Sequence, residues 1–366
     1  MDKVKRLLII KLSSIGDVVH ALPVSAAIGR NFPHIEITWV VEEMSAPVLA
    51  GNPYIKEVLT IPTQWKRSRW SFGTVRELAS LTRRLRARRF NVSIDLQGLS
   101  KSALLAYLSG APIRLGYCWL REIAPLLEKP VPRHPESAHI VDQLLDVAEY
   151  LGAERAPVEF PLAVSPGNLS RAKVLLSQVA IDYRSPFIVV NPSDGGGGYK
   201  GLGADRIAVL IRRLHEESAV PVVLVGSAAD QKVADQIIEQ ARFEVPSLVS
   251  MTTLAELIAI LKLCSLHLSG DTGTAHIAAA LGRPVISIFG RSNPDRLAPY
   301  GQLENVIVHR ECCHSICKRF HETAPINSKQ KCMAPPPSCL AAVTAEEVLA
   351  AVYRLLPGKL NVYDTI

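Results

Sequence analysis

The chain has 366 residues, of which 48% are hydrophobic and 20% charged; this is too long for one ordinary α/β domain and suits two globular domains with sizeable cores. No apolar run is long enough to span a bilayer, and the apolar stretch 7–10 is too short for a signal-peptide core, so we expect a cytoplasmic protein. The net charge of +7 permits an anionic partner such as nucleic acid, a membrane surface or a phosphorylated substrate, but does not choose among them.

Short β-branched runs alternate with helical patterns along the chain, which indicates parallel sheets with helices on both faces. In the first half we predict strands at 4–11, 35–41, 57–61 and 91–96, and helices at 18–30, 72–89, 100–108 and 138–151. In the second half we predict strands at 187–191, 221–225, 266–270 and 285–289, and helices at 204–215, 229–240, 253–263, 274–281 and 345–355.

A junction rich in proline, 156–185, separates the two halves. We therefore predict two doubly wound, Rossmann-like α/β domains, 1–165 and 166–343, that face a central cleft. The last segment, 344–366, is expected to form a helix that packs back on the N-terminal domain. Ligands of such folds bind at the carboxyl ends of the strands, so motifs at those ends are candidate site residues.

The first such motif, 11–20 (KLSSIGDVVH), lies where the first strand passes into the first helix. Gly16 allows a tight turn, and Ser13, Ser14 or Asp17 can cap the helix. A carboxylate at a strand end that faces a cleft is also a sound candidate for removing a proton from an acceptor hydroxyl. The residues alone leave both interpretations of Asp17 open.

The second motif, 269–276 (SGDTGTAH), links a strand to an Ala-rich helix. Its small residues let a ligand approach the N–H groups of the first helical turn, which form an anion site together with the helix dipole. The hydroxyls of Thr272 and Thr274 can add hydrogen bonds. Asp271 as a plain helix cap is the alternative, but a cap does not require a glycine between two threonines, so we favour a phosphate site.

The third motif, 191–201 (NPSDGGGGYKG), matches G-x-G-x-x-G, although a run of four glycines meets that pattern by chance. No acidic residue ends the next strand at 225–227, where a dinucleotide fold holds the ribose, so an oxidoreductase is disfavoured. Lys200 either reaches phosphate oxygens or is a solvated loop lysine. Because no Walker motif and no Asp-x-Asp pair occurs, Lys200 and the 269–276 turn, rather than magnesium, would meet the charge of a departing diphosphate.

Basic residues of the first half suit the binding of an acidic acceptor, since arginine makes paired contacts with phosphate and carboxylate groups. A loop flanked by tryptophans and two later arginines supply the candidates: Lys66, Arg67, Arg69, Arg114 and Arg121. The arginine run at 83–89 is better explained as the solvated face of a helix.

Five cysteines lie within 312–339, and in a cytoplasmic protein such a cluster points to metal before disulfides. Four thiolates could hold zinc or iron tetrahedrally: Cys313, Cys317, Cys332 and Cys339. No C-x-x-C pair is present, so metal and free thiols stay equally open. Any such metal would be structural, because four cysteines leave no open position.

Taken together, these motifs resemble the bacterial heptosyltransferases of glycosyltransferase family 9. The likeness runs to the helix at 344–355 and is carried by the segments 13–20, 39–43, 94–102 and 270–283. It implies a GT-B fold in which the N-terminal domain binds the acceptor and the C-terminal domain binds ADP-heptose. It also implies inverting transfer of L-glycero-D-manno-heptose to a hydroxyl of the lipopolysaccharide inner core, without a catalytic metal or other cofactor.

The resemblance also implies roles for single residues. Asp17 matches the general base, and Lys200 matches the lysine that contacts the diphosphate. Positions 226 and 251–253 fall where adenine and ribose are held. The expected donor-binding residues are Ser193, Gly226, Met251, Thr252, Asp271, Thr272, Gly273, Thr274, Ala275 and His276. Ser14 and Gly16 join the basic residues above as expected acceptor contacts.

The expected partners are a nucleotide sugar, an anionic lipid-linked saccharide of the lipid A–Kdo type and the inner surface of the inner membrane, but no nucleic acid. The cysteine segment resembles the metal-bearing finger of related heptosyltransferases that modify autotransporter proteins, which keeps a protein acceptor open. The glycines at 195–198 depart from the family pattern beside the lysine, which keeps another nucleotide sugar open. A non-catalytic ligand-binding protein is the remote alternative.

Overall fold

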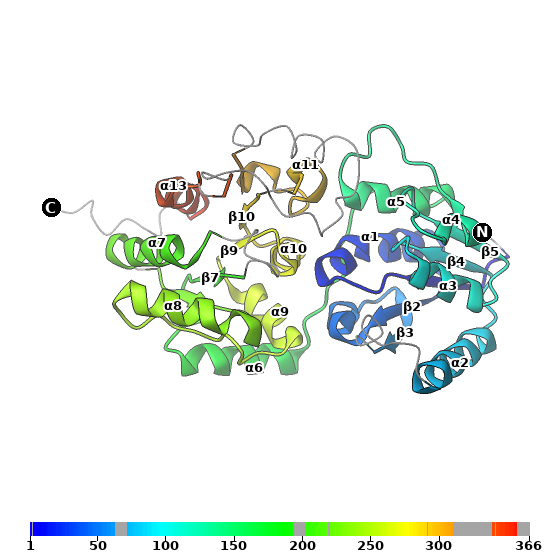
Figure 1. Ribbon diagram of the computed structural model, residues 1–366, viewed down its shortest axis with the longest axis horizontal. Helices are drawn as coiled ribbons and strands as arrows, with labels where there is room; N and C mark the ends of the chain where they lie inside the picture. Colours follow the sequence, from blue (N-terminus) through cyan, green and yellow to red (C-terminus); the bar gives the residue numbers. More distant parts are fainter. Residues whose placement is uncertain are drawn as a thin grey trace. The chain divides into compact units, whose positions relative to one another are not determined.

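The computed structural model describes residues 1, 3–62, 72–193, 202–218, 220–290, 292–309, 339–340 and 342–356. The chain divides into two compact units, Met1–Ala163 and Val164–Ile366, each with its own parallel sheet (Figure 1). Within the described residues, no helix is both long and apolar enough to cross a membrane.

The first unit contains a sheet of six parallel strands in the order β3-β2-β1-β4-β5-β6. The strands are β1 (Arg6–Ile10), β2 (Glu36–Glu42), β3 (Ile55–Ile61), β4 (Val92–Asp95), β5 (Ile113–Gly116) and β6 (Lys129–Pro130). The helices are α1 (Ile15–Asn31), η1 (Glu43–Leu49), α2 (Phe72–Ala87), α3 (Ser100–Leu108), α4 (Ala124–Leu127) and α5 (Ile140–Tyr150). The order changes direction between β1 and β4, and doubly wound folds bind ligands at the carboxyl ends of such a strand pair.

Both faces of this sheet are covered, which explains the apolar runs of its strands. Successive side chains of a strand point to opposite faces, so Leu8 and Ile10 share a buried cluster with residues of α2 and α3. Leu7 and Ile9 are equally buried on the other face. Helix α1 packs against α5. Most side chains buried in this sheet are therefore apolar, with Ser93 and Asp95 of β4 among the polar exceptions.

The second unit contains a sheet of five parallel strands in the order β11-β10-β9-β7-β8. The strands are β7 (Ile188–Asn191), β8 (Val222–Leu224), β9 (Leu266–Gly270), β10 (Val285–Ile288) and β11 (Val306–Ile307). The helices are α6 (Pro166–Gln178), α7 (Ala204–Glu217), η3 (Ala228–Asp230), α8 (Gln231–Ala241), α9 (Leu254–Leu263), α10 (Gly273–Ala280), α11 (Pro294–Leu297), η4 (Leu303–Asn305) and α13 (Ala345–Leu355). Here the order changes direction between β7 and β9.

Helix α13 packs into the core of the second unit, and its expected contact with the N-terminal domain stays a prediction. Its apolar stripe, Val348, Leu349 and Val352, is buried in the same cluster as residues of α7, α8 and four strands. Helix α13 packs directly against α7. Helices α6, α9 and α10 form a second packed group, since α9 contacts both of the others.

Helix α6 lies inside the predicted junction 156–185 and was absent from the sequence prediction. Ser165 caps it, accepting a hydrogen bond from the N–H of Asn168 at 3.2 Å, and Pro166 occupies the first helical turn. Proline is well tolerated there, since the first N–H groups of a helix have no intrahelical partner. The proline that suggested an irregular linker therefore marks a helix start. The short strands β5, β6 and β11 were also not predicted.

Candidate functional site

Three segments that carry the family resemblance meet at the carboxyl ends of β1, β2 and β4. Gln97 follows β4, and its side-chain oxygen accepts hydrogen bonds from the backbone N–H groups of Leu12 (3.2 Å) and Ser13 (3.3 Å). The buried Lys11 ammonium donates to the carbonyl oxygen of Leu96 at 2.8 Å. The turn after β4 thus holds the segment that leads from β1 into α1.

Residues of β2 also contact the segments that follow β1 and β4. Glu42 is 2% exposed, and its carboxylate lies 3.4 Å from the Nζ of Lys101 in the first turn of α3. Trp39 donates its indole N–H to the carbonyl oxygen of Lys11 at 3.2 Å. A charge at this depth is tolerable only when it is paired. The segments 39–43 and 94–102 therefore support the segment that carries Asp17.

Asp17 caps its own helix. Helix α1 begins at Ile15, and one carboxylate oxygen of Asp17 accepts hydrogen bonds from the N–H (3.0 Å) and the hydroxyl (2.7 Å) of Ser14. This is a capping box. Two donors on one oxygen fix the orientation of the half-buried carboxylate. The cap that the sequence left open is present, and the proton-accepting role of Asp17 stays a prediction.

A buried pair of carboxyl groups lies beneath this edge. One oxygen of Asp95 accepts the N–H groups of Gln97 (2.7 Å) and Gly98 (3.0 Å), which fixes the turn that presents Gln97. Burial, and then the charge and hydrogen bond of Asp95, raise the pKa of Glu128 to about 10. Two backbone N–H groups donate hydrogen bonds to Asp95, and such donors stabilise a carboxylate. We therefore place the negative charge on Asp95 and the shared proton on Glu128.

The expected acceptor residues are only partly described. Lys66, Arg67 and Arg69 lie outside the described residues. Arg121 is exposed, and its N–H donates to the carbonyl oxygen of Gly98 at 2.9 Å, which places it beside the turn after β4.

Arg114 has partners within its own surroundings. Its guanidinium donates to the carbonyl oxygens of Leu127 (2.9 Å) and Ala111 (2.9 Å), and lies over the ring of Tyr107, 5.5 Å from its centroid. These contacts tie α4 to β5, a structural role that spacing along the chain did not reveal.

Helix α10 begins with the small residues singled out in the sequence. Thr272 is its N-cap residue, and the Thr272 side chain makes no capping hydrogen bond to the first turn. Gly273 and Thr274 follow half-buried, whereas Ala275 and His276 are buried. The first-turn N–H groups of a helix favour an anion, and here small side chains surround them.

Asp271 is not the cap of this helix. One of its carboxylate oxygens accepts the hydroxyl of Ser292 at 2.6 Å, and the other lies 3.7 Å from the Nε2 of His276. Asp271 therefore ties the turn before α10 to the segment that follows β10. The plain-cap alternative for Asp271 is wrong in this respect, because the residue after it takes the cap position.

Two polar residues of this site were missed by the sequence analysis. Asn191, at the end of β7, donates its side-chain N–H to the Thr274 hydroxyl at 3.0 Å, and accepts the N–H of Ser193 at 2.8 Å. His267 in β9 lies 3.0 Å from the same hydroxyl. A histidine inside an apolar strand was the available signal. The register that pairs Asn191 with Ser269 brings these groups together.

The expected adenine and ribose positions lie side by side at the end of β8. The N–H of Ser250 donates to the carbonyl oxygen of Gly226 at 3.0 Å, so Met251 and Thr252 follow directly beside it. A Cβ at Gly226 would come within 3.0 Å of Asp230, which explains a glycine there. Met251 is 49% exposed and offers an apolar surface at this strand end.

Lys200 and three of the four candidate metal ligands, Cys313, Cys317 and Cys332, lie outside the described residues. Cys339 is described and is buried in the apolar cluster of the second unit. Its surroundings are those of a small hydrophobic residue.

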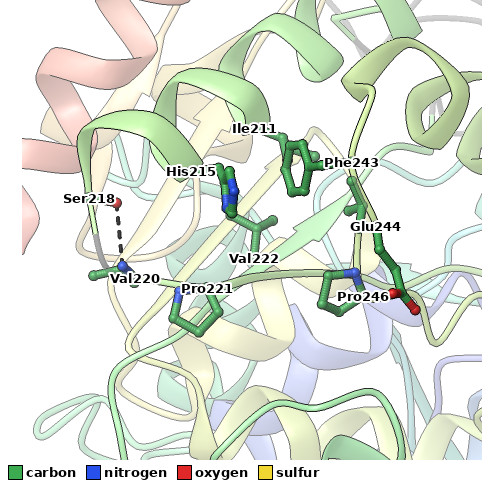
Figure 2. A pocket seen from close by; sticks show the side chains of 10 residues that line it. Ile211, His215, Ser218, Val220, Pro221, Val222, Phe243, Glu244 and Pro246 are labelled. Carbon is green, nitrogen blue, oxygen red and sulfur yellow. Dashed lines mark hydrogen bonds between the residues drawn. The ribbon is translucent and has the colours of Figure 1, made fainter.

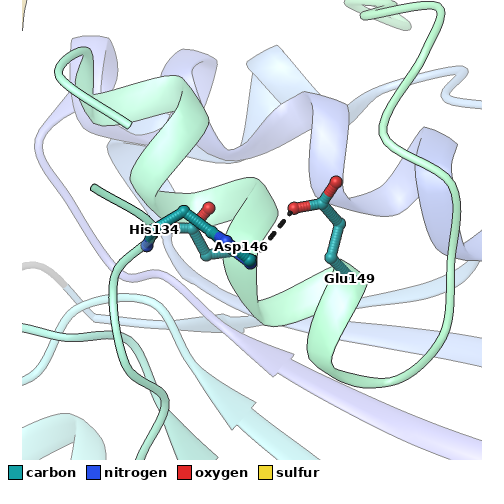
Figure 3. A group of neighbouring side chains, drawn as sticks. All are labelled: His134, Asp146 and Glu149. Carbon is teal, nitrogen blue, oxygen red and sulfur yellow. Dashed lines mark hydrogen bonds and ion pairs between the residues drawn. The ribbon is translucent and has the colours of Figure 1, made fainter. Parts of the chain in front are cut away.

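Among the described residues, His134, Asp146 and Glu149 form a group of possible metal ligands whose donor atoms lie within 4.8 Å of one another (Figure 3). Arg155 already supplies the positive charge there, because its Nη2 lies 2.6 Å from both Asp146 and Glu149. We therefore assign this group to the packing of α5 and not to a cation.

The second unit has a cavity of about 400 Å³ (Figure 2). This cavity lies beside the amino end of β8, whereas the donor is expected at the carboxyl ends of the strands. Its lining includes Pro221 and Val222, at the amino end of β8, and the ring of His215, which stacks on Phe243 at 4.1 Å. The turns described above follow the carboxyl ends of the strands instead.

Two parallel, doubly wound units in one chain define a GT-B fold, as expected from the sequence. The glycosyl transferase family 9 structure from Veillonella parvula matches with a TM-score of 0.79 at 21% identity, covering 96% of this chain and 97% of that one. The E. coli heptosyltransferase WaaC with ADP matches with a TM-score of 0.69 at 23% identity, covering 96% and 100%.

Sequence relatives agree with the fold. The lipopolysaccharide core heptosyltransferase OpsX of Haemophilus influenzae is 28% identical over 307 residues, which cover 83% of this chain and 84% of that protein. The family model "Glycosyltransferase family 9 (heptosyltransferase)" matches residues 78–326. The chain therefore belongs to glycosyltransferase family 9 and is a glycosyltransferase, which confirms the resemblance.

The shared proton of the Asp95–Glu128 pair predicts a specific pH dependence. The folded protein holds the Glu128 proton up to a pKa of about 10, whereas the unfolded chain releases it near 4.5. Between these values the folded state binds more protons, so stability falls as pH rises, by at most about 1.4 kcal/mol per pH unit. Glu128→Gln can donate an N–H to Asp95 in place of that proton, so its thermal melting temperature should exceed that of the wild type more at about pH 9 than at about pH 5.

The matched control is Glu154→Gln, which changes an exposed carboxylate of the same unit and should follow the wild type at every pH. If Glu128→Gln also followed the wild type throughout, the pair would not hold a proton in the folded state.

Proposed function

We propose that the protein transfers heptose from ADP-L-glycero-D-manno-heptose to a hydroxyl of the lipopolysaccharide inner core, with inversion and without a catalytic metal. The observation that carries this proposal is that each unit has a candidate site residue or turn at its own switch point: a capped carboxylate, Asp17, in the first unit and a small-residue helix start in the second. The names of its relatives support it: one is a lipopolysaccharide core heptosyltransferase, and another was solved with ADP.

In this proposal Asp17 is the general base. It takes the proton of the acceptor hydroxyl while that oxygen attacks the anomeric carbon and the bond from that carbon to the diphosphate breaks. A single displacement inverts the configuration. Gln97 and Ser14 support the role, because they fix the segment and the carboxylate that would meet the acceptor. Ser14 and Gly16 line the same turn as acceptor contacts.

The start of α10 would stabilise the negative charge of the departing ADP. The N–H groups that follow Asp271 would bind the diphosphate, and Lys200 would add a cation. Gly226, Met251 and Thr252 would hold the adenosine at the end of β8. This arrangement needs no magnesium, in keeping with a sequence that contains no Asp-x-Asp pair.

The acceptor is proposed to be an anionic, lipid-linked saccharide at the inner face of the inner membrane, reached from the cytoplasm. The surface around α4 supports this. Leu126 is 84% exposed and Ile123 is 46% exposed, and exposed Arg121 and Lys129 flank them. Apolar side chains between basic ones are suited to an anionic bilayer surface. Arg121 would then lie between the membrane and the acceptor.

The first test separates the two roles of Asp17. In Asp17→Asn the amide oxygen can still accept both bonds from Ser14, so the helix cap survives, but the amide cannot accept a proton. We expect kcat with ADP-heptose and a lipid A–Kdo acceptor to fall by about 10²–10⁴-fold with little change in melting temperature. Wild-type turnover in this variant would remove Asp17 from the base role.

The control for this test is Glu347→Gln. Glu347 caps α13 in the same way, accepting the N–H of Thr344 at 2.8 Å, and it belongs to no proposed site. Its amide variant should keep wild-type turnover.

The second test concerns the membrane surface. Leu126→Asp should weaken co-sedimentation with vesicles that contain anionic phospholipid by about 10-fold, since burying a leucine contributes about 1.5–3 kcal/mol. Leu303→Asp, at a 49% exposed leucine of the second unit, should sediment as the wild type does. Equal sedimentation of all three proteins would refute the α4 surface.

A structural metal at Cys313, Cys317, Cys332 and Cys339 is proposed as a separate feature, and would favour the alternative of a protein acceptor. Protein purified without added metal should then contain about one zinc or iron per chain by elemental analysis, and Cys313→Ser should lower this content, whereas Cys118→Ser should not. A folded, metal-free wild type would end this proposal.

A further inference from the structure

We propose that His267 is a positioning residue of the donor site. It holds the Thr274 hydroxyl inside the protein, so that the diphosphate is bound by backbone N–H groups and not by the threonine hydroxyls. This inference rests on the proposed function, because it assumes that the start of α10 binds the diphosphate of the donor.

His267 links two strands and a helix. It lies in β9, is fully buried, and contacts one group through each ring nitrogen. Nδ1 lies 3.0 Å from the carbonyl oxygen of Val189 in β7, and Nε2 lies 3.0 Å from the hydroxyl oxygen of Thr274 in α10. Leu266 and Leu268 point to the opposite face of the sheet, into the core formed with α7.

The partners determine where the hydrogens lie. A carbonyl oxygen can only accept, so Nδ1 carries the hydrogen that bonds to Val189. Burial lowers the pKa of His267 to about 4, and the ring is therefore neutral near pH 7. A neutral imidazole carries one hydrogen, which leaves Nε2 as an acceptor. The Thr274 hydroxyl must donate to Nε2.

This donation uses the only hydrogen of the Thr274 hydroxyl. The oxygen of Thr274 in turn accepts the side-chain N–H of Asn191 at 3.0 Å and lies 2.9 Å from the hydroxyl oxygen of Thr272. Since Thr274 has no second hydrogen, Thr272 is the donor in that contact. Both threonine hydroxyls thus direct their hydrogens inward, contrary to the expectation that they donate to phosphate.

These hydrogen bonds hold the first turn of α10 in one conformation before a ligand binds. His267, Asn191 and Thr274 connect the carboxyl ends of β7 and β9 to the first turn of α10, so the first-turn N–H groups keep one direction whether or not a ligand is bound. A site organised before binding loses less freedom when the ligand arrives. Removing the acceptor at Nε2 would leave the Thr274 hydroxyl to turn toward other partners and would loosen this turn.

Two substitutions separate the two ends of the imidazole. In His267→Gln the amide group can place an oxygen near the position of Nε2, which keeps an acceptor for Thr274. In His267→Asn the shorter side chain can place its N–H near the position of Nδ1, which keeps the bond to Val189 but leaves Thr274 without its acceptor. We expect the Kd for ADP, measured by calorimetry, to rise about 10-fold in His267→Asn and less than about 3-fold in His267→Gln. The donor KM should rise in the same order, with kcat changing less.

Thr274→Val and its combination with His267→Asn test whether the two residues act as a unit. If Thr274 acts through His267, the double variant should bind ADP about as weakly as either single variant. Fully additive losses would mean that Thr274 contacts the ligand by itself and would overturn the inference. Equal ADP affinity of His267→Asn and wild type would overturn it as well.

Leu268→Ala is the matched control for general destabilisation. It lies beside His267 on the same strand and faces the opposite core, so it should lower the melting temperature and leave the Kd for ADP near that of the wild type. A folded wild type that bound no ADP would instead contradict the proposed donor site. The two failures are therefore distinguishable.

Discussion

Burial of both faces of each sheet is the constraint on which the rest of this protein depends. A parallel strand that is covered on both sides is mostly apolar along its length, as in β1, and the central strand β9 departs from this only at His267 and Ser269. Polar side chains that serve a ligand are consequently confined to the turns beyond the carboxyl ends of the strands. Asp17 and the turn at 270–274 both lie at such ends, each beside the point where the strand order changes direction.

Two polar side chains within the buried layers, Asp95 and His267, stabilise those turns. Asp95 uses one oxygen to hold the turn that presents Gln97, and Gln97 holds the backbone before Asp17. In the second unit His267 holds Thr274 in the first turn of α10. Because an unpaired buried polar group is costly, each of these side chains has a defined partner, and the partner is a part of the proposed site. Both units thus place a buried polar side chain beneath the turn that would meet the substrates.

Most elements of the fold could be predicted, because strand and helix differ in the period of their apolar residues and this period is local. The differences between the prediction and the structure also arise at single residues. Pro166 suggested a linker, since proline interrupts most helices, although it is acceptable in a first turn. For Arg114, a sequence does not show that its guanidinium reaches the carbonyl oxygens of Leu127 and Ala111, and its role as an acceptor contact stays a prediction.

The sequence by itself determined the fold class, the family and the segments that end the strands, because small residues, glycines and a capping carboxylate are recognisable by their order along the chain. Only the tertiary structure decided which side chains support those segments. Ser13 and Gln97 are 84 positions apart, and His267 and Val189 are 78 apart. Their meeting depends on the order and register of parallel strands, which bring distant residues side by side at one sheet edge. The position of a hydrogen on His267 follows from burial and from both neighbours at once, and no stretch of sequence contains that combination.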